Sequence, residues 1–283
     1  MRIAPLITPR ARTTGLTAKE EELLRAVRID DSQPGPVLRD FETLLSFLGD
    51  DGCPIVQRNQ TIVTPSLVAL NELLTYRTPD DLKRPQQRSF PYIQGLYLVL
   101  RASGIGRIEG TGSRGRLVVD ARLVDSWRGL NLTERYLNLL EAWLVHAHSA
   151  LLGRPTLVRR PFFLESNALF ESIPTTGAVF GRPVYPDHIL PLVSDDCHFA
   201  LLELFGLFAL QRAEPGDRGS WLLTGIRRPP FASALFAALA AAPVFRQAPD
   251  GRWPVPGVFG CLQPLLLPYF PDWRNNLPSP TSA

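Results

Sequence analysis

The order of structural elements repeats along this chain, and that repeat is the feature that most restricts its fold. Residues 92–100, "YIQGLYLVL", form an apolar run typical of a buried helix, and Ser103-Gly104 ends it. "GRIEGTGSRGRLVVD" (106–120) then has the pattern of a β-hairpin, and a helix follows. The same order returns at "CHFALLELFG", at a hairpin about "PGDRG" and at "PFASALFAALAA". Because this is the element order of a winged helix, the sequence predicts two such units.

We therefore predict a mainly helical α+β protein with small β-hairpins and tandem winged-helix-like units. Its expected segments are an N-terminal helix and linker (1–36), a helical winged-helix-like domain (37–152), a proline-rich connection (153–193), a second winged-helix-like unit (194–258) and a proline-rich tail (259–283). Residues 37–75 carry a weaker form of the pattern and could form a third copy.

Composition narrows the class of protein. The net charge is only +3, whereas nucleic-acid-binding proteins usually have a stronger basic balance or a clear basic face. The three cysteines are far apart and form no CxxC pair, which excludes a disulfide framework and fits a reducing cytoplasm. No signal-peptide core is visible at the N-terminus, and no apolar window reaches the ~18 residues of a membrane span. We expect a cytoplasmic protein without a membrane partner.

One stretch, "LNLTERYLNLLEAWLVHAH" (130–148), places two acids and two histidines on what the sequence predicts to be one helix. Glu134, Glu141 and His148 are seven residues apart, which is about 10 Å along a helix, so they cannot hold one metal ion. We predict that they form a solvated face, with Glu134 as the capping-box partner of Asn131. The opposite, apolar face, which includes Trp143, should be core.

Other motifs with chemical potential favour structural roles. "GIGRIEG" (104–110) follows a helix and precedes strands, which is the reverse of a dinucleotide-binding loop. The aspartate pairs, beginning with Asp30-Asp31, lie at helix boundaries, where acids cap and support turns. Cys197 and His198 would diverge on a helix and would need His188 to complete a site. We predict no catalytic residue, no metal ligand and no cofactor.

The first hairpin has the composition of a wing that touches nucleic acid. In a winged helix, the helix before the hairpin enters the major groove and the hairpin contacts phosphate. Arg107, Arg114 and Arg116 suit phosphate contact, but the preceding helix has almost no polar side chain for base edges. The sequence therefore predicts contact with the DNA or RNA backbone through these three arginines, without sequence readout.

Two blocks of sequence resemble a known family. "W..LN.TERYLNLLEAWL" (127–144) and "FGCLQPLLLPYFPDWRNNL" (259–277) look like the upstream, helical half of the plasmid (Ri) ORF-three-like proteins. The resemblance implies an association with plasmids and mobile elements. It also implies that in relatives the tail leads into an ORF-three-like domain, which is absent after Asn276, so that domain is an expected partner. No activity comes with the resemblance.

Three functions remain open on the sequence. The first is a non-enzymatic accessory or interaction protein that contacts nucleic acid non-specifically through the arginine wing. The second is a purely protein-binding scaffold, or the truncated half of a larger protein. The third and weakest is a metal-dependent hydrolase that would use the Asp and His residues.

Overall fold

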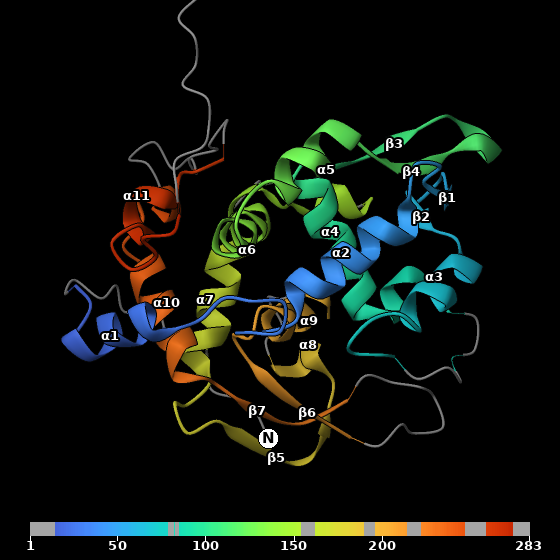
Figure 1. The fold of residues 1–283 in the computed structure, drawn as a ribbon. Helices are drawn as coiled ribbons and strands as arrows, with labels where there is room; N and C mark the ends of the chain where they lie inside the picture. Colours follow the sequence, from blue (N-terminus) through green and yellow to red (C-terminus); the bar gives the residue numbers. More distant parts are fainter. Residues whose placement is uncertain are drawn as a thin grey trace, which may run out of the picture.

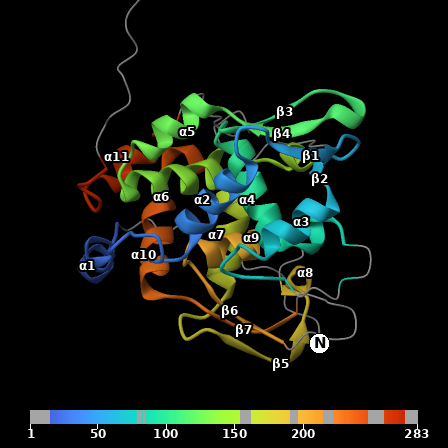
Figure 2. The same cartoon turned by 45° about the vertical axis from the view of Figure 1, so that its right-hand side comes forward.

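The computed structural model describes residues 15–78, 82, 85–153, 162–189, 196–213, 222–246 and 259–273. These residues form the mixed α+β fold that the sequence predicts, and within them lie many helices and two small antiparallel sheets. In two views the sheets lie at opposite ends of the molecule, with helices between them (Figure 1, Figure 2). No helix of the described segments is long and apolar enough to cross a membrane.

The first unit comprises residues 37–119. Its elements are α2 (Val37–Leu48), β1 (Cys53–Val56), β2 (Thr61–Ile62), α3 (Thr64–Asn71), α4 (Pro91–Ala102), β3 (Gly106–Glu109) and β4 (Arg116–Val119). The strand order is β2-β1-β4-β3, and Cys53 of β1 pairs with Leu117 of β4. Residues 37–75 are therefore not a third copy. They supply the first helix of the unit, α2, and the strands β1 and β2, which join the β3–β4 hairpin in one sheet.

The second unit comprises residues 162–227 and has a similar plan. Its elements are α7 (Phe162–Ser172), β5 (Ala178–Val184), α8 (Pro186–Ile189), α9 (Cys197–Leu204), β6 (Ala209–Arg212) and β7 (Leu223–Arg227). The strand order is β5-β7-β6, with Ala178 opposite Ile226. The segment expected as a connection (153–193) thus holds the unit's first helix and strand. In both units the first strand pairs with the last.

Helices α4 and α9 pack against each other at the centre of the molecule, which joins the two units (Figure 2). Residues 91–100 of α4 and every residue of α9 are buried, as their apolar composition predicts. Close approach depends on Gly95, because a Cβ atom there would lie 2.8 Å from Leu201 Cγ. The two apolar helices can therefore pack this closely only while position 95 has no side chain.

The stretch 130–148 is not one α-helix. After α5 (Ala121–Arg128), α6 runs over Leu132–Glu141 and continues as a π-helical turn, Ala142–His146, closed by the Ala147 N–H bond to the Ala142 carbonyl. The predicted apolar face is core, since Trp143 is fully buried. Its Nε1 donates to His198 Nδ1 at 3.1 Å, and its ring stacks on Phe205. This turn therefore packs the end of α6 onto α9.

The two ends of the described chain lie together on one side of the molecule (Figure 1). Helix α1 (Ala18–Ala26) begins with a Thr17–Glu20 capping box and packs on α10 (Pro230–Leu239). The tail contains the short helix α11 (Gln263–Leu266), which also contacts α10. The aromatic residues Phe270 and Trp273 of the tail are buried, so this segment is part of the core.

Candidate functional site

Two of the three predicted wing arginines already have structural partners. Arg107 donates to Glu109 at 2.7 Å and to Asp120 at 2.9 Å, so its charge is offset on the wing itself. Arg116 donates to the backbone carbonyls of Asp51 and Gly52 at 2.6 and 2.8 Å. It therefore ties the loop after α2 to β4. Both guanidinium groups therefore already have partners in the folded chain.

Arg114 is the wing arginine that remains available. It lies at the turn of the β3–β4 hairpin, is exposed, and its side chain has no ion pair or hydrogen bond within the described part of the chain. The β1–β2 turn lies beside it, because Ile55 N–H bonds to the Gly115 carbonyl and a Cβ at Gly115 would meet Gln57. That turn carries Arg58, which is exposed and equally unpaired among the residues described. We call Arg58 and Arg114 the arginine pair.

Sequence reasoning missed Arg58 because the two turns are more than fifty residues apart. The signal that could have found it is the pairing of β1 with β4, which brings the turns to one end of the sheet. The geometry therefore places Arg58 beside Arg114, on neighbouring turns of two hairpins.

The predicted solvated face of α6 is wrong for both acids. Glu134 is 2% exposed and Glu141 is fully buried. Glu134 does form the predicted capping box with Asn131, with its carboxylate accepting the Asn131 N–H at 3.0 Å. Glu141 instead accepts the backbone N–H groups of residues 260, 261 and 262 at 2.7, 3.1 and 3.3 Å. Periodicity could not show this, because the tail that covers Glu141 lies about 120 residues away in the chain.

A buried polar cluster joins the two units, and the sequence did not indicate it. Glu203 of α9 accepts from Tyr92 Oη of α4 at 2.5 Å and from Arg212 Nη2 of β6 at 2.6 Å. The Arg212 guanidinium also lies over the Tyr92 ring. Burial, and then the Glu203 carboxylate, hold the pKa of Tyr92 well above its usual value. The cluster makes an ordered contact between the units, and its Arg212 side chain is 30% exposed.

The remaining sequence motifs, Cys197-His198, Asp30 and "GIGRIEG", are part of the folded framework. Cys197 and His198 are buried within α9; Asp195 and the side chain of His188 lie outside the described residues. Asp30 accepts from Ser32 and Gln33, which supports a turn and lowers the pKa of its carboxyl. Gly104, with φ +77°, follows α4 and precedes β3, as predicted for "GIGRIEG". No group of three or more His, Cys, Asp or Glu residues in the described segments is placed to hold a metal ion.

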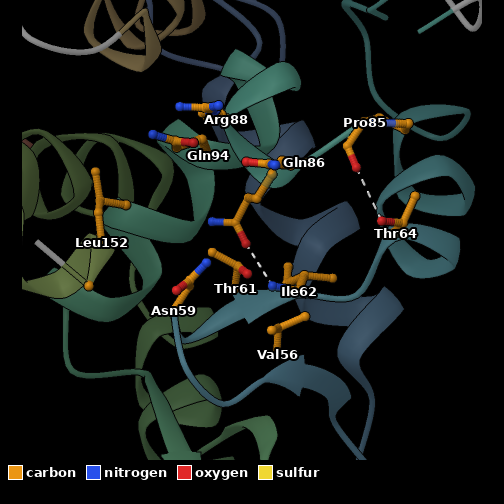
Figure 3. Close-up of a pocket in the computed structure, with 12 residues that line it drawn as sticks. Val56, Asn59, Thr61, Ile62, Thr64, Pro85, Gln86, Arg88, Gln94 and Leu152 are labelled. Atoms are coloured by element: carbon orange, nitrogen blue, oxygen red, sulfur yellow. Dashed lines mark hydrogen bonds between the residues drawn. The ribbon is translucent and has the colours of Figure 1, made fainter. Parts of the chain in front are cut away.

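A polar cleft of about 460 Å³ lies between the β1–β2 hairpin, the turn at 85–88, the side of α4 and the turn at 152–153 (Figure 3). Its lining includes Asn59, Gln86, Gln87, Arg88 and Gln94. Most of these polar side chains are amides, and none of the lining residues is acidic. A volume of this size falls within the range of small-molecule sites.

Comparison of the chain with protein-family models, with curated proteins and with solved structures found no match. The resemblance to the plasmid (Ri) ORF-three-like proteins therefore stays a prediction from the two quoted blocks.

Proposed function

We propose that this protein is a non-enzymatic, cytoplasmic accessory protein that holds two winged-helix-like units in a rigid tandem and contacts nucleic acid through its phosphate backbone alone. The observation that supports this most is the burial of α4 and α9 against each other. Each is the third helix of its unit, the position from which a winged helix reads the major groove. Because both helices are buried, neither can place side chains against base edges in the major groove.

The arginine pair gives the described surface two neighbouring cations that suit phosphate. Arg58 and Arg114 are exposed, lie on neighbouring turns and make no ion pair with the rest of the described chain. Contacts of this kind are electrostatic and independent of base sequence, and they weaken steeply as salt rises. Two such contacts, on a protein of net charge +3, support weak binding that is lost at high salt.

Fluorescence anisotropy with labelled double-stranded DNA, single-stranded DNA and RNA tests the proposal. At low salt we expect binding that does not distinguish unrelated sequences of one type, with a salt slope of roughly two counterions. The double variant Arg58→Ala/Arg114→Ala should abolish that binding. The matched control is Arg246→Ala, which removes an exposed arginine after α10 that has no ion pair among the residues described. The proposal would be overturned if the protein did not bind nucleic acid at low salt, or if Arg246→Ala weakened binding as much as the double variant. The protein-binding scaffold would then be the remaining function.

The link to mobile elements and an ORF-three-like partner domain is proposed on the sequence resemblance only. Co-expression of this chain with such a domain, followed by size-exclusion chromatography, tests it directly. A stable complex supports the partnership, and separate elution removes it.

A further inference from the structure

We propose that the polar cleft beside the β1–β2 hairpin binds a nucleotide, with amide side chains on the base and Arg88 on the phosphate. The inference concerns a site distinct from the arginine pair and does not depend on the proposed function. It rests on the cleft, on one oriented buried amide and on the charge of the lining.

Gln87 is the oriented group. It is 3% exposed, and its Oε1 accepts the Ile62 backbone N–H at 2.7 Å, which is drawn as a dashed line in Figure 3. Because an amide oxygen accepts and an amide nitrogen donates, the Ile62 N–H identifies the atom it contacts as the oxygen of Gln87. The other terminal atom of the side chain is therefore the NH₂ nitrogen. That nitrogen has no hydrogen-bond partner within the described residues, although Gln87 lines the cleft. This nitrogen reaches the solvent of the cleft, where it can donate to an acceptor on a ligand.

The rest of the lining supplies both polarity and charge. Gln86 and Asn59 are exposed amides at the cleft, and amides offer a donor and an acceptor side by side, as base edges require. Leu152 and the exposed Val56 line the cleft and can provide apolar contact for a ring (Figure 3). Arg88 is exposed, has no ion pair in the part of the chain described, and is the cation of the lining. Its guanidinium matches a phosphate geometrically, and no lining carboxylate opposes an anion.

Isothermal titration of the whole chain with the four nucleoside 5′-monophosphates, and with inorganic phosphate, tests the proposal. We expect saturable binding of at least one nucleotide, tighter than that of phosphate. Equal affinity for phosphate alone would overturn the base contact, and no saturable binding of any nucleotide would overturn the site. A short single-stranded oligonucleotide shows whether the natural ligand is a free nucleotide or a nucleotide within a strand. Tighter binding of the oligonucleotide than of the mononucleotide indicates a strand, and equal affinity indicates a free nucleotide.

Two variants assign the binding to this cleft. Gln87→Glu keeps the oxygen that accepts from Ile62 but replaces the donor with a negative oxygen, and Arg88→Ala removes the phosphate contact. Each should weaken nucleotide binding by about tenfold or more, the effect of losing one good hydrogen bond or ion contact. Arg246→Ala should leave it unchanged. Unfolding curves matching the parent chain show that the variants are folded, and unchanged affinity in both folded variants would overturn the proposal.

Discussion

The phenolic oxygen of Tyr92 donates a 2.5 Å hydrogen bond to the carboxylate of Glu203, and this bond crosses from the first unit to the second. Glu203 is 6% exposed and also accepts from Arg212 Nη2 and from the Leu210 N–H. A buried carboxylate is tolerated because each of its neighbours is a donor. The contact between the units is therefore specific as well as apolar.

Removing Glu203 should be costly. Glu203→Ala removes the carboxylate that accepts from the Tyr92 hydroxyl and from the partly exposed Arg212 guanidinium, so we expect a loss of at least about 1.5–3 kcal/mol in the free energy of unfolding. Tyr92→Phe removes one charge-assisted bond and should cost about 1.5–3 kcal/mol. Urea unfolding of both single variants and the double variant measures the coupling. Additive losses would show that the bond does not join the units energetically.

Gly95 should not accept a side chain. Gly95→Val would force atoms into Leu201, whose Cγ would lie 2.8 Å from an added Cβ, so we expect a loss of about 1–3 kcal/mol from overpacking. The control is Gly181→Val in β5, where an added Cβ meets no atom within 4 Å. Thermal unfolding should separate the two variants. Equal melting temperatures would show that α4 and α9 do not need this close approach.

Trp143 should be one of the costliest core positions. It is fully buried, stacks on Phe205 and donates to His198, so Trp143→Ala should lower the free energy of unfolding by about 3–5 kcal/mol. The surface residue Leu123, which is 44% exposed on α5, provides the comparison, and Leu123→Ala should change stability by less than about 0.5 kcal/mol. A denaturant melt measures both. A Trp143→Ala loss under about 1 kcal/mol would contradict its place in the core.

Glu141 should hold the tail in place. Glu141→Gln keeps one oxygen that can accept the N–H groups of residues 260 and 261, but it removes the charge and sets an NH₂ group against the Leu262 N–H, so we expect a loss of about 1–3 kcal/mol. Limited proteolysis should then cut within residues 259–273 sooner than in the parent chain. Glu22→Gln on the exposed face of α1 is the control and should leave the cleavage rate unchanged. Unaltered proteolysis in Glu141→Gln would show that the tail does not depend on this carboxylate.

The Cys261 thiol should be unreactive in the folded protein. Burial raises its pKa well above the ordinary value, and the neighbouring Glu141 carboxylate raises it further. Since the thiolate is the nucleophile, a raised pKa leaves the neutral thiol dominant at pH 8. Alkylation by iodoacetamide, followed by peptide mass spectrometry, should be slow in the folded chain and fast in urea. Equal rates in both states would contradict the raised pKa.

Local pattern was sufficient for several elements of the fold. The burial of α4 and α9, the capping box at Asn131 and the apolar face around Trp143 are all confirmed. These features depend on residues a few positions apart, where hydrophobic period and capping chemistry act directly. For the same reason the mixed α+β class could be predicted without any tertiary information.

The candidate sites depended on contacts between distant segments. Glu141 has the spacing of a solvated residue, and it is buried because the tail returns to supply three N–H donors. Arg116 has the position of a wing contact, but carbonyls after α2 bind its guanidinium, while Arg58 joins Arg114 through the pairing of β1 with β4.

The sequence by itself thus determined which segments form helices and strands and which faces are apolar. Only the tertiary structure decided which charged side chains are free. A buried carboxylate or guanidinium is paired with groups from segments far away in the chain, and a local sequence pattern does not show which segments meet.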